Sequence, residues 1–139
     1  MIILALIGGD SCGKTTTLNI VYEIIIKEEG VSKLKITEGN PINKDFSDIV
    51  CYKSKNVAFF SMGDYSNITT RIIKEYDTHN VDFLILASNI KFKKPIKLIA
   101  RFENQLIEKT IVIDKDKYLD ANIFDAEVIL RIFKKTFKF

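Results

Sequence analysis

Hydrophobic residues along the chain fall into two kinds of segment: continuous apolar runs and stretches with helical spacing. Residues 2–7 (IILALI) and 81–88 (VDFLILAS) are short runs, and each predicts a strand that is buried on both faces of a sheet. From Lys14 to about Glu29 the apolar residues recur every three or four positions, and Gly30 follows them. This stretch therefore predicts a helix that ends at the glycine.

The rest of the chain continues with shorter elements. Residues 48–52 and 57–61 are two extended runs joined by a polar turn at residues 53–56, which predicts a hairpin. Residues 38–46 contain glycine, proline and asparagine, so this segment is the most loop-like of the chain. The pattern also predicts strands at residues 33–37 and 106–114 and helices at about residues 67–79, 95–105 and 120–135.

Strands and helices alternate after the first glycine-rich segment, which favours an α/β fold. We expect three layers, with a mostly parallel central sheet that includes one antiparallel hairpin. A chain of 139 residues without an evident linker or internal repeat predicts a single domain over residues 1–139.

Composition and charge exclude few function classes. The chain is 47% hydrophobic and 28% charged, and its net charge of +3 is too small to favour a nucleic-acid or membrane partner. The two cysteines predict no disulfide framework, and the apolar start lacks the basic leader of a signal peptide. We therefore expect a cytoplasmic protein with no membrane contact and no clear nucleic-acid binding.

The segment that carries chemistry is GGDSCGKTT, between the first strand and the first helix. The spacing G-x-x-x-x-G-K-[ST] lets successive backbone N–H groups point at phosphate oxygens, and its lysine reaches the β- and γ-phosphates. The threonine hydroxyl binds Mg²⁺, and the positive end of the helix favours the anion. The predicted nucleotide-binding residues are Gly8, Gly9, Asp10, Ser11, Cys12, Gly13, Lys14, Thr15 and Thr16.

With this motif the chain resembles P-loop nucleoside-triphosphatases over its whole strand–loop–helix pattern. The spelling of the loop, with Asp10 two residues after the first glycine, is similar to that of thymidylate-kinase-like nucleotide kinases. TEGNP (residues 37–41) resembles the substrate loop of the same kinases, and VAFFSMGD with VDFLILAS resembles a group of small, poorly characterised P-loop proteins. The resemblance implies a three-layer P-loop fold that binds a nucleoside triphosphate and Mg²⁺. Those kinases also carry an arginine-bearing lid and an aspartate–arginine pair, and this sequence has neither.

Acidic residues near the loop are the candidates for metal binding and catalysis. Asp64 follows the run VAFFSMG, so it either holds Mg²⁺ together with Thr15, directly or through a water, or caps a turn. Asp10 either positions the attacking oxygen as a general base or bonds to its own loop backbone. Ser61 occupies the end of the strand, where a metal-binding acid is usual, and Glu38 is a candidate for acceptor binding or a solvated residue.

Basic residues and the base-recognition pattern say less about the reaction than the acidic residues do. Arg71 is the arginine most favourably placed to reach the phosphates, with a solvated helix surface as its alternative. Lys91, Lys93 and Lys94 either cover phosphates or keep a loop soluble. Asn89 lacks the lysine and aspartate of a guanine-binding Asn-Lys-x-Asp motif, so ATP is favoured over GTP.

The sequence thus predicts a magnesium-dependent ATP-binding protein in which Lys14, Asp10 and Asp64 are catalytic. It would hydrolyse ATP or transfer the γ-phosphate to a small acceptor, as a nucleotide kinase does. The alternative is a nucleotide-binding switch or accessory subunit with slow turnover, which needs a second copy of the chain or another protein partner. Whether the protein is an enzyme stays open between these two.

Overall fold

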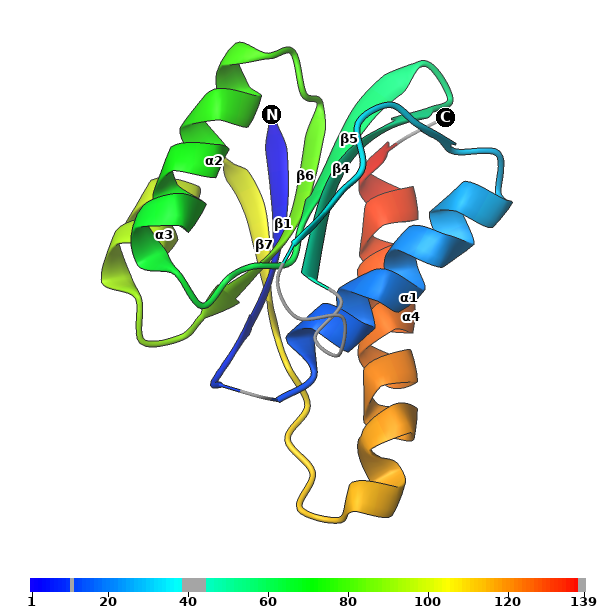
Figure 1. Ribbon diagram of the computed structural model, residues 1–139, viewed down its shortest axis with the longest axis vertical. Helices are drawn as coiled ribbons and strands as arrows, with labels where there is room; N and C mark the ends of the chain where they lie inside the picture. The colour runs from blue at the N-terminus through cyan, green and yellow to red at the C-terminus, as the bar shows by residue number, and fades with distance from the viewer. Residues whose placement is uncertain (11, 39–44, 138–139) are drawn as a thin grey trace.

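The computed structural model describes residues 1–10, 12–38 and 45–137 of the chain (Figure 1). In chain order the elements are β1 (Ile2–Gly8), α1 (Lys14–Lys27), β2 (Val31–Ser32), β3 (Ile36–Glu38), β4 (Asp45–Tyr52), β5 (Lys55–Phe60), α2 (Ser66–Thr78), β6 (Phe83–Asn89), α3 (Lys93–Ile99), β7 (Glu103–Glu108) and α4 (Tyr118–Phe137). A short 3₁₀ turn at Lys115–Lys117 leads into α4.

The strands form one mixed sheet in the order β2-β4-β5-β6-β1-β7, with β3 also paired to β4. Strands β5, β6, β1 and β7 are parallel, whereas β4 is antiparallel to β2, β3 and β5. The expected α/β class is confirmed, but the expectation of a mostly parallel sheet is wrong. The reason is β4, which takes three antiparallel partners instead of the single hairpin partner expected.

Helices pack on both faces of the sheet (Figure 1). Helices α1 and α4 cover one face, where Leu18, Ile129 and Phe133 join the larger apolar core. Helices α2 and α3 cover the other face, where Ile73 and Ile99 join a second core. The residues of β1 alternate between the two cores, as the period of two along a strand requires.

The predicted hairpin is confirmed, and its strands begin earlier than expected. Lys53 and Ser54 form the turn with φ of 48° and 68°, the left-handed conformation that a two-residue hairpin turn needs. β4 begins at Asp45, inside the segment expected to be a loop. The remainder of that expected loop, residues 39–44, lies outside the described residues.

Two expected elements near the C-terminal third have different bounds in the structure. The helix expected over residues 95–105 ends at Ile99, because Glu103–Glu108 pairs with β1 as the strand β7. The strand expected over residues 106–114 accordingly ends at Glu108. Edge pairing with β1 thus outweighs the helical spacing of the local sequence.

The connections of β1 and β6 make a topological switch point at the carboxyl ends of these strands. The two strands are adjacent and parallel, with Gly8 opposite Asn89 at their carboxyl ends. The chain leaves β1 into α1 on one face, and it leaves β6 into α3 on the other (Figure 1). Ligands of open α/β sheets bind at such switch points, beyond the carboxyl ends of the strands.

Candidate functional site

Two glycines of the loop between β1 and α1, Gly8 and Gly13, lie where a Cβ atom would be crowded. Gly13 has a φ of 93°, and a Cβ atom there would lie 2.5 Å from Oδ1 of Asn122. A Cβ on Gly8 would lie 2.7 Å from Sγ of Cys12. Helix α1 begins at Lys14, directly after Gly13, which has no side chain to cap the first N–H groups of the helix. Ser11 lies outside the described residues.

Lys14 is folded into this loop. Its side chain is 5% exposed, and its ammonium group donates hydrogen bonds to the carbonyl oxygens of Gly8 and Gly9. The ammonium also lies 3.5 Å from Oδ1 of Asp64, which comes from the loop between β5 and α2. Backbone oxygens and one carboxylate thus surround a nearly buried positive charge, which is the arrangement a buried lysine requires.

Asn89, the last residue of β6, connects the two acids that the sequence predicts to be catalytic. It is buried, and its Nδ2 donates to Oδ1 of Asp10 and, at 3.2 Å, to Oδ1 of Asp64. Its Oδ1 accepts a hydrogen bond of 3.0 Å from the backbone N–H of Lys91. Asp10, Asp64 and Lys14 therefore meet at the carboxyl ends of β1 and β6. The sequence reading considered Asn89 only for base recognition and missed this role, because pairing of β6 with β1 was not evident.

Asp10 also forms an ion pair beyond the carboxyl ends of β1 and β6. The ammonium of Lys91 lies 2.9 Å from Oδ2 of Asp10, and both side chains are more than half exposed. The hydrogen bond from Lys91 is the main reason that the pKa of Asp10 is lowered, and the same bond raises the pKa of Lys91. Asp10 is thus held as a carboxylate.

Thr15 points to a different acid from the one expected. Its hydroxyl donates a 2.8 Å hydrogen bond to Oδ1 of Asp45, the first residue of β4. The hydroxyl of Ser61 donates to the same oxygen at 3.1 Å and accepts a hydrogen bond from the N–H of Phe46. Thr15 and Asp64, expected to share a metal ion, are therefore held by separate partners. The sequence reading missed Asp45, because it assigned that residue to a loop.

A pocket of about 320 Å³ adjoins the loop. Its walls come from the loop and α1, from the segment after β7, and from the first turns of α4. The lining residues are Asp10, Cys12, Gly13, Thr16, Lys109, Thr110, Ile111, Val112, Tyr118, Ala121 and Asn122. Asn122 also accepts a 3.3 Å hydrogen bond from the hydroxyl of Thr17, which fixes α4 against α1 beside Gly13.

A buried ion pair holds the wall of the pocket that follows β7. Nζ of Lys109 lies 2.7 Å from Oδ2 of Asp125, and the two side chains are 1% and 3% exposed. Asp125 also accepts hydrogen bonds from the N–H and the hydroxyl of Thr110. The sequence offered no signal for this pair, because its members belong to two elements that meet only in the fold.

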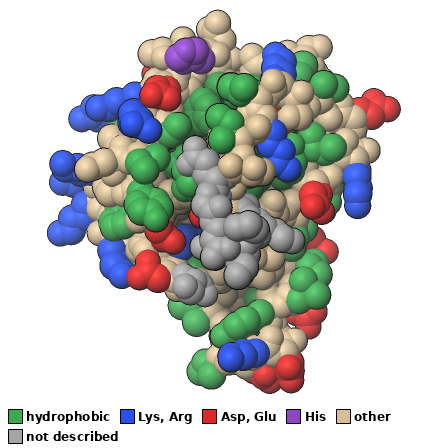
Figure 2. Space-filling view, in the orientation of Figure 1, with side chains coloured by type: hydrophobic (Ala, Val, Ile, Leu, Met, Phe, Trp, Pro, Cys, Tyr) green, Lys and Arg blue, Asp and Glu red, His purple; other side chains and the backbone are tan. Residues whose placement is uncertain are grey.

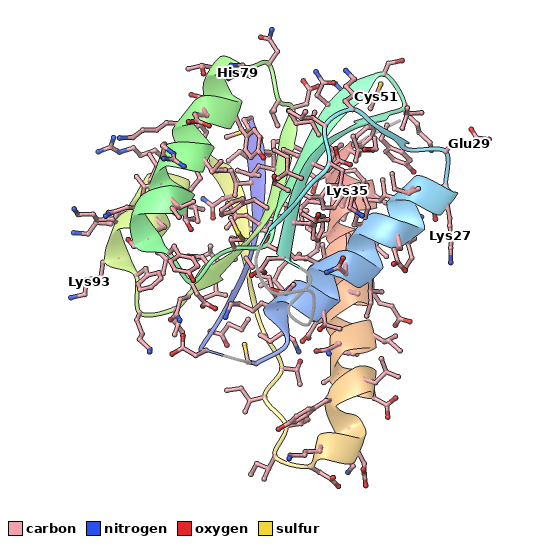
Figure 3. All side chains as sticks on the ribbon, in the orientation of Figure 1. Lys27, Glu29, Lys35, Cys51, His79 and Lys93 are labelled. Carbon is pink, nitrogen blue, oxygen red and sulfur yellow. The ribbon has the colours of Figure 1, made fainter. Side chains whose placement is uncertain are left out.

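Other residues singled out from the sequence lie away from these contacts. Arg71 lies on α2, where it pairs with Glu75 at 3.7 Å and both side chains are exposed. Lys93 and Lys94 are exposed at the start of α3, and Figure 3 shows Lys93 pointing outward. They belong to a basic surface over α2 and α3, which Figure 2 shows on one side of the molecule. The side chain of Glu38 lies outside what the structure describes.

Among the described residues, no group of three or more histidine, cysteine, aspartate and glutamate side chains could by itself hold a metal ion. No helix in the described part of the chain has the length and apolar character needed to cross a bilayer. Comparison with models of protein families, with curated proteins and with solved structures found no match for this chain.

Proposed function

We propose that this chain is a P-loop protein that binds ATP with Mg²⁺ and hydrolyses it or transfers its γ-phosphate to a small acceptor. The observation that carries the proposal is the position of Lys14. A nearly buried ammonium lies within a glycine loop, at the start of a helix, after a buried parallel strand. The same strand–loop–helix context gives the motif its phosphate-binding mechanism. The finer assignment, a three-layer P-loop fold, is part of this proposal.

The contacts of Lys14 indicate how the loop would take up a phosphate. The carbonyl oxygens of Gly8 and Gly9 now accept its hydrogen bonds, and phosphate oxygens would be stronger acceptors because they are charged. The first N–H groups of α1 would donate to the same anion. Thr15 would hold Mg²⁺, which would neutralise charge that develops on the phosphate oxygens.

The pocket beside the loop suits the nucleoside part of ATP. Its lining includes the apolar or aromatic residues Val112, Tyr118 and Ala121 beside the polar residues Thr110 and Asn122. Sites for small molecules typically combine apolar walls with a few polar groups in this way. Adenine needs only apolar contacts and backbone groups, which agrees with the preference for ATP over GTP.

Asp10 and Asp64, which both accept hydrogen bonds from the amide of Asn89, would serve the transfer step. Asp10 lies both at the pocket and in the network of Asn89, and its lowered pKa keeps it ionised. An ionised carboxylate at this place would position the attacking water or acceptor hydroxyl. Asp64 would return the ammonium of Lys14 to its place after product release.

A nucleotide-dependent switch or accessory subunit is the second candidate, and the arginines favour it. No arginine is among the residues that line the pocket or contact Lys14 in the described part of the chain. Arg71, the expected candidate, is paired on the exposed face of α2. An arginine on the γ-phosphate stabilises the transition state, so a partner chain would have to supply it.

Release of ADP from magnesium-ATP tests the proposal, first alone and then with each common nucleoside monophosphate. Release without an acceptor supports a hydrolase, whereas release with one monophosphate supports a nucleotide kinase. Binding without release supports the switch. We expect Lys14→Ala to lower ATP affinity or turnover by about 10²-fold or more, as does loss of a charge-stabilising donor.

Lys27→Ala is the matched control, because Lys27 is exposed at the other end of the same helix (Figure 3). We expect it to bind and turn over ATP as the unmodified chain does. Equal ATP binding by the Lys14 and Lys27 variants would contradict the proposal.

A further inference from the structure

We propose that Asp45, together with the hydroxyl groups of Thr15 and Ser61, forms the protein's magnesium-binding group, in place of Asp64. The inference rests on the proposed function, because it concerns the metal ion that accompanies ATP. It assigns the metal carboxylate to the start of an antiparallel strand. It also makes Ser61, the residue directly after β5, one of the oxygen ligands of the metal ion.

The first support is the direct contact with the residue of the motif that binds magnesium. One carboxylate oxygen of Asp45 accepts hydrogen bonds from Thr15, at 2.8 Å, and from Ser61, at 3.1 Å. Two hydroxyl oxygens and a carboxylate thus converge on one point. Mg²⁺ prefers hard oxygen ligands, and a hydroxyl has lone pairs with which to accept it. The donor set therefore fits this ion.

The second support is the rigidity of the group. Asp45 is followed by Phe46, which is 1% exposed and packs against Tyr22 of α1 with ring centroids 5.0 Å apart. The backbone of Phe46 is bonded to Ser61 in both directions, to its hydroxyl at 2.9 Å and to its N–H at 3.0 Å. The strand and the helix thus hold Asp45, Ser61 and Thr15 in a fixed relation, as a metal site requires.

The third support is the charge around the competing acid. Asp64 is half exposed, and its Oδ1 lies 3.5 Å from the ammonium of Lys14. A divalent cation placed there would meet that positive charge at short range. Among the described residues, the hydrogen-bond partners of Asp45 are uncharged hydroxyl groups. Within that part of the chain, its carboxylate keeps its negative charge for a metal ion.

The test compares ATP affinity in Mg²⁺ with ATP affinity in EDTA for three variants. We expect Asp45→Asn to lower the ratio of the two affinities by about 10- to 100-fold, as loss of a metal-supporting group does. Asp64→Asn should keep the ratio of the unmodified chain. Asp77→Asn, at an exposed position on α2, is the control and should also keep it.

Binding in EDTA separates a metal effect from misfolding, because under the proposed function the loop and Lys14 would hold phosphate without the ion. A variant that binds ATP normally in EDTA is folded. Mn²⁺ provides a second readout: with ATP present, the enhancement of water proton relaxation by bound Mn²⁺ should fall for Asp45→Asn and for Thr15→Ala. It should not fall for Asp64→Asn.

Three outcomes overturn the inference. The first is a normal ratio for Asp45→Asn, and the second is a ratio that Asp64→Asn lowers as far as Asp45→Asn does. The third is an unmodified chain whose ATP affinity is the same in Mg²⁺ and in EDTA, which overturns the metal site but leaves nucleotide binding standing. Absence of ATP binding under both conditions would overturn the proposed function and this inference together.

Discussion

The parallel and antiparallel halves of the sheet contribute to the candidate site in different ways. In the parallel half, β1 and β6 deliver the glycine loop, Asn89 and the surroundings of Lys14 from their carboxyl ends. In the antiparallel half, β4 delivers Asp45 from its first residue. An antiparallel strand begins at the end of the sheet where its parallel neighbours finish, so both halves contribute residues at the same end.

This difference shows why a site on a mixed sheet has two kinds of contributor. A search at the carboxyl ends of buried strands finds the residues of the parallel half, because each follows a continuous apolar run. Residues from the antiparallel half precede their strand. They enter the site only because the hairpin reverses the chain, and this depends on pairing between distant segments.

The largest effect on stability is expected from breaking the buried ion pair of Lys109 and Asp125, which joins the segment after β7 to α4. Asp125→Ala leaves the ammonium of Lys109 without its carboxylate and frees Thr110 from two hydrogen bonds. We expect the free energy of unfolding to fall by about 3–5 kcal/mol, the usual cost of an uncompensated buried charge. Urea denaturation measures it.

Glu127→Ala is the control for this change, since Glu127 is exposed on the same helix. We expect it to change stability by less than about 0.5 kcal/mol, as surface substitutions do. A loss of under about 1 kcal/mol for Asp125→Ala would show that the pair contributes little to holding the pocket wall.

The next effect is expected within the parallel half, where the segment after β5 passes close to β6. A Cβ atom on Gly63 would lie 2.0 Å from the carbonyl oxygen of Ala87 and 2.7 Å from Cα of Ser88. Gly63→Ala must therefore push the segment after β5 away from β6, at a cost of about 1–3 kcal/mol. Thermal unfolding should show a lowered midpoint.

The same displacement should separate Asp64 from Lys14 and Asn89, whereas Asp45, on the other half, should keep its contact with Thr15. Gly9→Ala is the stability control, because a Cβ there would have no atom within 4 Å. If Gly63→Ala unfolds at the temperature of the unmodified chain, the segment after β5 is not packed against β6 as tightly as the contact with Ala87 indicates.

The sequence predicted β1 and β6 of the parallel half better than the start of the antiparallel strand β4. Local patterns mark the first two, whereas pairing between distant segments sets the third. The continuous runs of β1 and β6 and the helical spacing of α1, α2 and α4 are local signals, and the structure confirms all five. Asp45 was assigned to a loop, because polar residues surround it. The contacts of Asn89 and the Lys109–Asp125 pair depend on strand order and helix docking, which no local pattern encodes. Binding by Ser11 and the side-chain role of Glu38 stay predictions.

A smaller effect is expected where α1 meets the antiparallel half. The hydroxyl of Tyr22 donates a 2.7 Å hydrogen bond to the buried carboxylate of Asp48, on β4. Tyr22→Phe removes this bond and should cost about 1–2 kcal/mol at neutral pH. The N–H of Leu34 still donates to Asp48, so the carboxylate is not left alone.

The same substitution has a signature at high pH. Burial, followed by the bond to Asp48, raises the pKa of Tyr22 to about 12, above the value of about 10 in an unfolded chain. The stability that this difference provides is complete below pH 10 and is lost as the pH rises from about 10 to about 12. Tyr22→Phe should therefore lose less stability over that range. Urea denaturation at pH 9 and pH 11 measures the difference, and equal losses would contradict it.

The smallest effect is expected from Lys91→Ala, which breaks the exposed ion pair with Asp10. The change should leave stability unaltered, because water and salt screen this pair. Its effect should appear in the pH dependence of ATP turnover. The hydrogen bond from Lys91 is the main cause of the lowered pKa of Asp10, so its removal raises that pKa.

If the carboxylate of Asp10 positions the attacking oxygen, the acid side of the pH–rate profile should move to higher pH in Lys91→Ala. Raising the salt concentration should move the acid side of the unmodified chain's pH–rate profile in the same direction, because salt weakens the ion pair. Lys94→Ala, at an exposed position at the start of α3, should leave the pH–rate profile in place. A profile that moves in neither Lys91→Ala nor high salt would remove Asp10 from the chemistry. Asn89 would then be a link between the glycine loop and Asp64, and the parallel half would contribute phosphate binding alone.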